Sequence, residues 1–452
     1  MIQTDTIVAI STPKGEGGIG IVRLSGPKAL PISQQMFRSQ PPLGQRVRHV
    51  EYGQIWAGGQ SIDTGVAWFF IAPHSYTGED TVEISCHGSM LILESVVGEA
   101  LRLGATSAEP GEFTRRAYLN GRLDLIEAEA VIDLIRASSK ASLENAYGQA
   151  GGRLSEMVRA LKKQVVRGLS LLEIGLDFSE EDIDDFGRQA IQDSLREVVD
   201  LSSRLAETFE GTKRRQEGYL IALLGRPNVG KSTLLNTLLG EDRAIVTPIP
   251  GTTRDLVEGR TIWSGDTVRL VDTAGVRQTD DPIEIEGIKR AARIAQEADI
   301  VFAIFDSSAP WCDDDQVVLD LLPFEKSIFI FNKLDLAPLF DRTKFEKQSS
   351  SVVEISALTE LGIDDLKRET SRRRPLSKDV DGIGISRQRH QDCLFRVVKS
   401  ATAAIELLVS GQPDECVVFE LREALSSLGE MLGENTDEDV LDSIFSEFCI
   451  GK

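Results

Sequence analysis

One glycine-rich stretch carries the residue types that bind phosphate. It reads Gly225-Arg-Pro-Asn-Val-Gly-Lys-Ser232 and fits the pattern G-x-x-x-x-G-K-[ST]. Glycines let backbone N–H groups turn toward phosphate oxygens, and the positive end of a following helix adds to the attraction. In this pattern Lys231 reaches the outer phosphates and the Ser232 hydroxyl can bind Mg²⁺. The stretch therefore predicts a triphosphate-binding loop rather than a simple glycine turn.

The segments around this loop have the order that a phosphate loop requires. An apolar run at 219–224 precedes it, and a helix-like segment at 233–239 follows it and ends at Gly240. Beyond it, strand-like and helix-like segments alternate to about residue 370. Such alternation predicts a mostly parallel sheet covered by helices on both faces.

Three further motifs follow, each at the end of an expected strand. Asp272-Thr-Ala-Gly275 would order Mg²⁺ through water and contact the γ-phosphate, and Ser356-Ala-Leu358 suits a loop behind the guanine O6. Asn332-Lys-Leu-Asp335 supplies a carboxylate that can accept hydrogen bonds from guanine N1–H and the exocyclic amine. Adenine lacks that pair of donors, and an unpaired polar group in such a site is costly. The four motifs together indicate a small GTPase domain.

Hydrolysis of a nucleotide triphosphate needs a group that orients the attacking water, and the residue that usually does this is absent here. Residue 276, after Asp272-Thr-Ala-Gly275, is valine, whereas Ras-type enzymes carry a water-orienting glutamine there. A monovalent cation near the β–γ bridge could supply the missing charge, with Asn228 offering a carbonyl oxygen. Glu284 or Glu286 could orient the water. These alternatives stay open on residue chemistry alone.

The segment Gly251-Thr-Thr-Arg-Asp255 occupies the place of the first switch of a GTPase. Thr253 within it is the expected second protein ligand of Mg²⁺, after Ser232. A flexible surface turn is the competing interpretation.

The composition limits which partners the protein can bind and in which cellular compartment it can be expected. The chain has 452 residues, enough for two to four domains, and a formal net charge of −21 that argues against a broad basic surface for nucleic acid. Its five cysteines form no C-x-x-C pair, so a disulfide framework or structural zinc is not expected. The N-terminus lacks secretory-signal features, and no apolar run approaches the ~20 residues of a membrane span. We expect a cytoplasmic protein without a membrane span.

The distribution of strand-like and helix-like patterns along the chain predicts four segments. Residues 1–118 mix strands and helices, and 217–375 form the inserted nucleotide domain. Residues 119–216 and 376–452 are rich in long helical patterns, and we expect them to build one discontinuous helical domain. The predicted fold is therefore multidomain: an N-terminal α+β domain, an all-α domain and an inserted Ras-like P-loop α/β domain. The glycine-rich segment 15–20 is expected to be a tight connection.

Motifs along the whole chain resemble the tRNA modification GTPase family MnmE, also called TrmE. The phosphate loop, the first switch and Asp272-Thr-Ala-Gly-Val-Arg277 are shared with other GTPases. The terminal Cys449-Ile-Gly-Lys452, similar to the family's Cys-[ILV]-Gly-Lys, separates this family from them. The N-terminal motifs that also match are Asp5-Thr-Ile-Val-Ala9, Gly17-Gly-Ile-Gly-Ile-Val-Arg23, Tyr76-Thr-Gly-Glu-Asp-Thr-Val-Glu83 and Pro110-Gly-Glu-Phe-Thr-Arg-Arg-Ala-Tyr-Leu-Asn-Gly-Arg122.

The resemblance implies a set of site residues in the nucleotide domain. It favours Glu284 over Glu286 as the catalytic, water-orienting residue, and it implies K⁺ ligands at Asn228, Thr247, Ile249 and Thr252. Motifs and resemblance together give the following expected GTP contacts: Asn228, Val229, Gly230, Lys231, Ser232, Thr233, Thr247, Pro248, Ile249, Pro250, Gly251, Thr252, Thr253, Asp272, Thr273, Ala274, Gly275, Asn332, Lys333, Asp335, Ser356, Ala357 and Leu358.

The resemblance also implies an activity and partners. The family forms a homodimer through its N-terminal domains, which bind a tetrahydrofolate one-carbon carrier in its formyl or methylene form. The matching folate contacts would be Arg23, Glu83, Arg122 and Lys452, with Arg122 standing where a relative can carry lysine. K⁺ replaces an arginine finger when two G domains meet. With the FAD-containing partner MnmG, in a heterotetramer, the family installs an aminomethyl-type group, here expected to be carboxymethylaminomethyl, at C5 of the tRNA wobble uridine.

Two points stay open at this level. Cys449 could be a nucleophile or a packed thiol. A GTP-switched ribosome-assembly or RNA-binding factor is the competing function, although it would need a basic RNA-binding domain that the sequence does not display. The high negative charge agrees with tRNA binding mainly through a complex.

Overall fold

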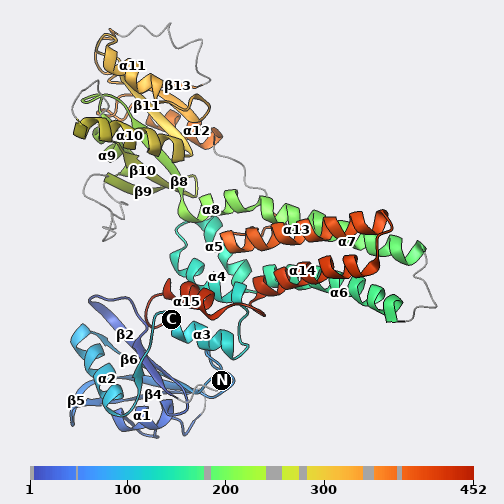
Figure 1. Ribbon diagram of the computed structural model, residues 1–452. Helices are drawn as coiled ribbons and strands as arrows, with labels where there is room; N and C mark the ends of the chain where they lie inside the picture. Colours follow the sequence, from blue (N-terminus) through green and yellow to red (C-terminus); the bar gives the residue numbers. More distant parts are fainter. Residues whose placement is uncertain are drawn as a thin grey trace. The chain divides into compact units, whose positions relative to one another are not determined.

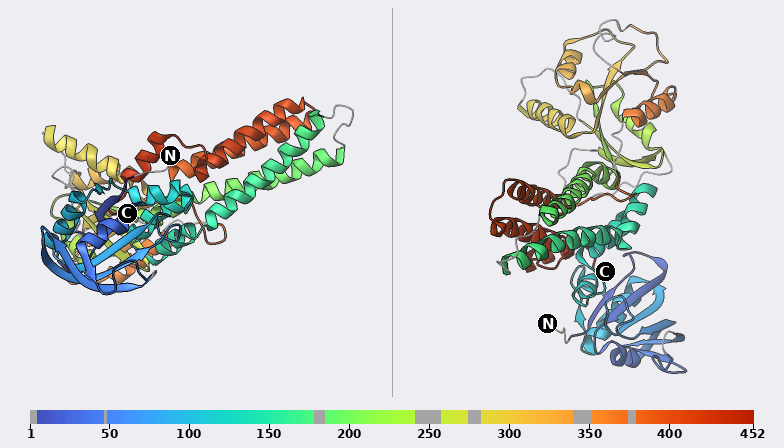
Figure 2. Two further views of the ribbon diagram at one scale, coloured as in Figure 1. Left: turned by 90° about the horizontal axis from the view of Figure 1, so that it is seen from below. Right: turned by 90° about the vertical axis from the view of Figure 1, so that its right-hand side faces the viewer.

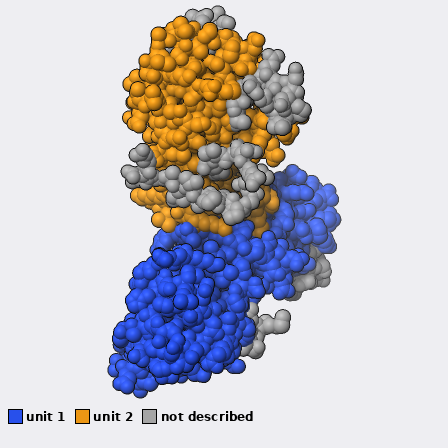
Figure 3. Space-filling view, turned by 90° about the vertical axis from the view of Figure 1, so that its left-hand side faces the viewer, with its two compact units in different colours: residues 1–135, 147–200, 393–452 blue, residues 136–146, 201–392 orange. Residues whose placement is uncertain are grey.

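The computed structural model describes residues 5–46, 49–177, 185–240, 257–273, 282–339, 351–373 and 379–452. For 175–177, 185–186, 257–258 and 282–285 only the backbone is described. The chain divides into two compact units, the first of residues 1–135, 147–200 and 393–452 and the second of residues 136–146 and 201–392 (Figure 3).

Unit 1 begins with a seven-stranded sheet in the order β3-β4-β5-β6-β2-β1-β7 (Figure 1). Neighbouring strands are antiparallel, except that β1 and β7 are parallel. The strands are β1 Ile7–Ile10, β2 Gly17–Ser25, β3 Phe37–Ser39, β4 Val50–Ala57, β5 Gln60–Phe70, β6 Thr81–Gly88 and β7 Thr106–Ser107.

Two helices, α1 Ala29–Met36 and α2 Met90–Arg102, pack on one face of this sheet. They bury side chains such as Ile32 and Val96 against inward-facing strand residues such as Ile84. Because side chains alternate along a strand, the residues between them, including Arg23 and Glu83, lie on the opposite face. This alternation places the charged residues of β2 and β6 away from the apolar core.

The glycine-rich segment 15–20 differs from its expected role as a connection. Gly17–Gly20 belongs to β2, where Gly17 pairs with Gly88 and Gly20 with Cys86 across a register shift. Glycine has low strand propensity, but pairing with the neighbouring strand β6 outweighs it. A sequence pattern could not show that β6 extends far enough to supply this partner.

The rest of unit 1 is helical. Apolar residues recur at helical spacing in each long helix, for example Val417, Leu421, Ala424 and Leu428, which are buried in α14. The helices α14 and α6 pack against each other. Arg188 of α7 forms an ion pair at 3.0 Å with Asp414, the first residue of α14. The helices are α3 Glu112–Leu119, α4 Leu125–Arg136, α6 Arg153–Asp177, α7 Asp185–Glu207, α13 Gln388–Val409, α14 Asp414–Leu432 and α15 Glu438–Ser446, with α4, α7 and α13 extending past the unit 1 ranges (Figure 2).

Unit 2 is built around a six-stranded sheet in the order β13-β12-β11-β8-β10-β9. All pairs are parallel except β9 with β10. The strands are β8 Tyr219–Leu224, β9 Val257–Trp263, β10 Asp266–Asp272, β11 Ile300–Asp306, β12 Ser327–Asn332 and β13 Val352–Glu354. The remaining helices are α5 Lys140–Ala150, α8 Phe209–Glu217, α9 Lys231–Leu239, α10 Pro282–Glu297, α11 Asp313–Asp320, η1 Phe324–Lys326 and α12 Ile363–Arg373.

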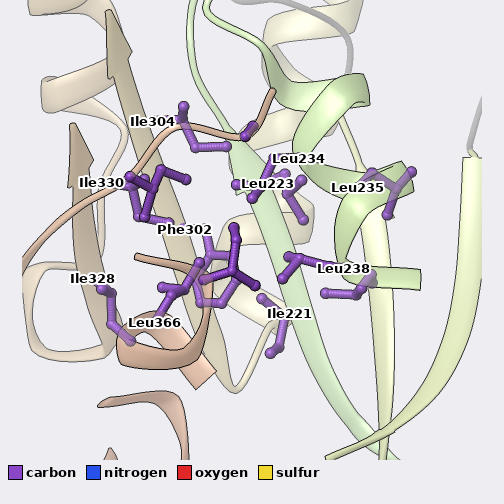
Figure 4. Close-up of a cluster of buried hydrophobic side chains, with 14 of the residues drawn as sticks. Ile221, Leu223, Leu234, Leu235, Leu238, Phe302, Ile304, Ile328, Ile330 and Leu366 are labelled. Carbon is purple, nitrogen blue, oxygen red and sulfur yellow. The ribbon is translucent and has the colours of Figure 1, made fainter. Parts of the chain in front are cut away.

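Helices cover both faces of this sheet. Leu234, Leu235 and Leu238 of α9 and Leu366 of α12 pack on one face, against Ile221 and other strand residues (Figure 4). The helices α10 and α11 pack on the other face. Every residue of β11 and β12 is consequently buried, as in parallel sheets covered on both sides. This confirms the predicted fold class, including the Ras-like domain with its mostly parallel sheet.

Within the described ranges, no helix combines the length and the apolar character that crossing a bilayer requires.

Candidate nucleotide-binding site

The carboxyl ends of the central strands bring the predicted motifs together in unit 2. The phosphate loop follows β8, Asp272 ends β10 and Asn332 ends β12. In a parallel sheet these ends share one edge, which is where open α/β folds bind ligands. Side chains far apart along the chain thus converge on one surface.

Lys231 begins α9 and lies almost fully buried beside the phosphate loop. Its ammonium donates to the carbonyl oxygens of Gly225 and Arg226, both at 3.1 Å. Burial lowers the pKa of Lys231, and the Asp272 carboxylate acts in the opposite direction. A triphosphate beside the ammonium would favour its charged form still more.

The loop backbone is held in two unusual conformations. Asn228 has φ of 64° and Gly230 has φ of 99°, both in the left-handed region. A Cβ at Gly230 would lie 2.3 Å from Nδ2 of Asn332, so only glycine fits there. The Nδ2 group of Asn332 donates to the carbonyl oxygen of Val229 at 2.8 Å. Asn332 therefore supports the loop in addition to its place in the guanine motif.

Of the residues expected to act on Mg²⁺, the structure describes Ser232 and Asp272, and their positions suit that ion. Ser232 Oγ donates to Asp272 Oδ2 at 2.8 Å, which brings the two oxygen-bearing side chains together. The other carboxylate oxygen of Asp272 is buried and has no hydrogen-bond partner among the described residues. A hydrated cation would satisfy it, and hard oxygen donors suit Mg²⁺. Thr273, next in the motif, donates its hydroxyl to Leu223 at 2.7 Å and thereby anchors the end of β10.

The guanine end of the site is preassembled. Ser356 Oγ donates to Asp335 Oδ1 at 2.5 Å, and the backbone N–H of Ala357 donates to Asn332 Oδ1 at 2.9 Å. Asp335 is exposed, so one oxygen stays accessible for a base. Leu358 has 77% of its surface exposed, whereas Ser356 and Ala357 are buried. The two predicted guanine motifs thus contact each other directly.

Lys333 contributes an ion pair next to the base position. It has φ of 67°, and its ammonium lies 2.6 Å from Asp306 Oδ2 at the end of β11. Burial opposes ionisation of Asp306, but the hydrogen bonds from Lys333 and Ser308 outweigh it and hold the pKa of Asp306 below its usual value.

Several predicted site residues lie outside the described ranges. They are Thr247, Pro248, Ile249, Pro250, Gly251, Thr252, Thr253, Ala274 and Gly275, together with Val276. The backbone of Glu284 lies in the first turn of α10, and its side chain is not described. The K⁺ set is therefore represented here by Asn228 alone.

A second charged cluster lies in unit 1. Arg23 Nε and Glu83 Oε1 form an ion pair at 2.7 Å because Arg23 of β2 pairs in register with Glu83 of β6. The guanidinium also donates to the carbonyl oxygen of Gly451 at 3.4 Å. It lies 5.6 Å from the Tyr76 ring centre and 5.5 Å from that of Phe113, within reach of cation–π attraction.

The C-terminal Lys452 belongs to the same cluster. Burial lowers the pKa of Lys452, and the nearby Arg23 charge lowers it further, while Glu83 and Cys449 act in the opposite direction. The backbone N–H of Phe113 donates to the carbonyl oxygen of Lys452 at 3.2 Å, which ties the chain end to α3. Cys449 is exposed.

A pocket of about 420 Å³ adjoins this cluster and connects Glu83 with Arg122. Its lining residues are Phe70, His74, Ser75, Tyr76, Thr81, Glu83 and Arg122. Sequence reasoning did not assign Phe70, His74 or Tyr76 to the site. The motif at 76–83 contained Tyr76, but Phe70 and His74 carried no pattern that could have revealed them. Aromatic rings beside an acid and a base suit a flat, polar-edged ligand.

Comparison with known proteins identifies the family. Residues 6–122 match the model described as GTP-binding protein TrmE N-terminus, and residues 125–449 match the MnmE helical domain. The chain is 41% identical to the tRNA modification GTPase MnmE of Geobacter sulfurreducens over 457 residues, covering 100% of both chains. It is 42% identical to the protein of that name from Geotalea uraniireducens and 39% identical to that from Clostridioides difficile, again over 100% of each chain. The chain therefore belongs to the MnmE family of tRNA modification GTPases.

Proposed function

We propose that this chain is a K⁺-activated GTPase that modifies C5 of the tRNA wobble uridine, together with an FAD-dependent partner of the MnmG type. The product would carry a carboxymethylaminomethyl group, built with a one-carbon unit from tetrahydrofolate. GTP binding, GTP hydrolysis in tRNA modification, and use of Mg²⁺ with the nucleotide follow from the family. The observation that carries the finer proposal is that one chain holds a guanine-nucleotide site and, in another unit, the Arg23–Glu83–Lys452 cluster with the pocket that adjoins it.

The experiment that tests this function is mass spectrometry of tRNA nucleosides. We expect a strain lacking this protein to lose the C5-modified wobble uridines and to regain them when the intact gene is restored. Other modified nucleosides in the same digests serve as internal controls. Unchanged wobble uridines, together with co-sedimentation of the protein with ribosomal subunits, would instead favour a ribosome-assembly factor.

We propose that a K⁺ ion bound at Asn228, Thr247, Ile249 and Thr252 supplies positive charge near the β–γ bridge, where other GTPases use an arginine finger. Support comes from Asn228, whose left-handed backbone in the middle of the phosphate loop is a conformation seldom adopted by non-glycine residues. Glu284 would orient the water, while Ser232 and Thr253 would hold Mg²⁺.

GTP turnover is expected to be about tenfold or more faster in KCl than in NaCl at equal ionic strength, a difference of roughly 1.4 kcal/mol in the barrier. The physical reason is that the two cations differ in size, so one coordination shell cannot suit both. GTP affinity measured in both salts is the control, because it separates binding from hydrolysis. Equal turnover in the two salts would contradict the cation proposal.

We propose that a formyl or methylene tetrahydrofolate binds at Arg23, Glu83, Arg122 and Lys452. The pocket supports this because the Glu83 carboxylate can pair with the donor edge of a pterin. Arg122 in its lining, and Arg23 beside Glu83, can pair with the carboxylates of the glutamate tail. The aromatic side chains of Phe70 and Tyr76 would contact the flat ring. Cys449 is exposed, which does not fit the role of a packed thiol.

Deleting Lys452 is expected to weaken folate binding about tenfold, the size of one well-placed charged contact, and to change GTP turnover less than twofold. The reason is that the ammonium is held beside Arg23 and Glu83, in a unit that does not contain the nucleotide site. Titration with 5-formyltetrahydrofolate measures the affinity. Lys399→Ala removes an exposed lysine of α13 and is the matched control. Unchanged folate affinity after the deletion would remove Lys452 from the site.

We propose that the N-terminal domains form a homodimer and that the chain then joins its partner as a heterotetramer. Exposed apolar residues on the N-terminal sheet support this, because Val50 and Tyr52 of β4 expose 60% and 69% of their surfaces. Exposed apolar residues that gather on one face often mark protein interfaces. The charge of −21 favours tRNA binding mainly through the complex.

The four-segment division remains a proposal: an N-terminal folate-binding and dimerisation domain at 1–118, helical parts at 119–216 and 376–452, and a G domain at 217–375. We also propose a cytoplasmic location, because relatives of this chain are named for tRNA modification.

A further inference from the structure

The second residue of the phosphate loop is tied to a helix that none of the GTPase motifs includes. Arg226 Nε lies 3.1 Å from Asp315 Oδ1 of α11, and the Asp315 side chain is only 2% exposed. We infer that Asp315 is a positioning residue for GTP binding: through Arg226 it holds the phosphate loop in the conformation that receives the phosphates.

The sheet explains why these two residues meet. The strands β8 and β11 are parallel neighbours, so the phosphate loop after β8 and the segment after β11 leave the sheet side by side. Backbone contact is close at this point, since a Cβ on Gly225 would lie 2.6 Å from the carbonyl oxygen of Ile304. The loop therefore starts against β11 and is linked to α11 one residue later.

Asp315 is itself held firmly by its own helix. Its Oδ2 accepts hydrogen bonds from the backbone N–H of Cys312 at 3.1 Å and from the Cys312 thiol at 3.3 Å. It lies in the first turn of α11, where the helix dipole favours a negative charge. Oδ2 of Asp315 is thus hydrogen-bonded at the start of α11. Oδ1 lies close enough to Arg226 for an ion pair, but the two groups are not aligned for a hydrogen bond.

The other end of the loop has its own anchor. Asn332 holds the carbonyl oxygen of Val229, and Lys231 holds that of Arg226. Only Pro227 and Asn228 lie between these two attachment points, and Asn228 has the left-handed backbone. Because phosphate binding depends on several loop N–H groups pointing the same way, losing one anchor should reduce the pre-organisation of the loop.

Charge alone predicts the opposite result, which makes the inference testable. Removing the negative charge of Asp315 near a triphosphate should tighten GTP binding if simple electrostatics dominate. If Asp315 positions the loop, its neutralisation should weaken binding even though Arg226 keeps its charge. The sign of the change in affinity therefore distinguishes the two.

The chain offers a matched control. Arg214 Nε and Asp299 Oδ1 form an ion pair at 2.7 Å, and Asp299 Oδ2 accepts the backbone N–H of Leu220 at 2.9 Å. This arrangement repeats that of Arg226 and Asp315, but at the opposite ends of β8 and β11. Asp299→Asn thus makes the same chemical change beside the opposite ends of the same two strands, away from the nucleotide.

The experiment measures GTP and GDP affinity, KM, kcat and thermal unfolding of the full-length Asp315→Asn, Asp299→Asn, Arg226→Ala and Arg226→Ala/Asp315→Asn proteins. We expect Asp315→Asn to weaken GTP binding about tenfold, within the range of coupled charge pairs, while Asp299→Asn changes it less than twofold at a similar unfolding temperature. The double variant should bind GTP no more weakly than Arg226→Ala alone. Unchanged or tighter binding by Asp315→Asn, or additive effects in the double variant, would overturn the inference. So would equal losses in Asp315→Asn and Asp299→Asn, because those would indicate general destabilisation.

Discussion

Replacing Glu284 with alanine is expected to leave GTP affinity nearly unchanged and to lower GTP turnover by about 10²-fold or more, the usual contribution of a positioned acid–base group. The reason is that Val276 has no group that can orient the attacking water, so another residue near the second switch must do so. Glu284 lies in the first turn of α10, the helix that follows Asp272 along the chain.

The neighbouring Glu286 provides the control for this prediction. It has the same chemistry and lies in the same helix two residues later, a spacing at which helix positions are not neighbours on one face. Glu286→Ala should keep its turnover. Single-turnover hydrolysis and binding of a fluorescent GTP analogue separate the chemical step from affinity. If Glu284→Ala retains turnover within about threefold, roughly 0.6 kcal/mol of barrier, then the water is oriented by another group.

Replacing Asp335 with asparagine is expected to change the preferred base from guanine to xanthine. The carboxylate can accept both N1–H and the exocyclic amine of guanine, whereas an amide presents one acceptor and one donor. Xanthine carries a carbonyl oxygen at C2 in place of the amine, so it can accept from that donor. Ser356 can still donate to the amide oxygen, as it now does to Asp335 Oδ1 at 2.5 Å, which keeps the side chain in place.

Affinity for GTP should fall by about 10³-fold, since a site built for a polar edge rejects a mismatched one strongly. Hydrolysis of XTP should rise, and that gain distinguishes an altered base preference from a damaged fold. Asp320→Asn, at the exposed end of α11, is the control and should retain GTP preference. An Asp335→Asn protein that still prefers GTP to XTP would show that Asp335 does not contact the base.

Much of the fold could be predicted because local patterns and final packing agree. The runs at 220–224 and 328–331 are apolar throughout, which is what a sheet covered on both faces requires. The long helices α6, α13 and α14 follow from apolar residues at helical spacing. Prediction is weaker where a partner strand decides the structure: Gly17–Gly20, expected to be part of a connection, pairs with β6 as a strand.

The nucleotide site was predictable for a related reason. Each motif contains its own chemistry within three to eight consecutive residues, and each lies at the carboxyl end of a strand, at one edge of the sheet. Arg226 belongs to such a motif, yet its partner Asp315 lies in a helix without any recognisable pattern. An ion pair between distant residues depends on which strands are neighbours in the sheet. The order of the strands cannot be predicted from the local sequence around Arg226 or around Asp315.

The phosphate loop, the guanine motifs, the terminal Cys449-Ile-Gly-Lys452 and the family resemblance were determined by the sequence itself, because each is a short run of residues whose chemistry is local. Only the tertiary structure decided what surrounds them. The register of β2 with β6 brings Arg23 to Glu83, and the chain end joins them through Gly451 and Lys452. Likewise, the pairing of β8 with β11 brings Asp315 beside the phosphate loop. These contacts arise from long-range strand pairing, and pairing between strands depends on the packing of the whole domain rather than on any one segment.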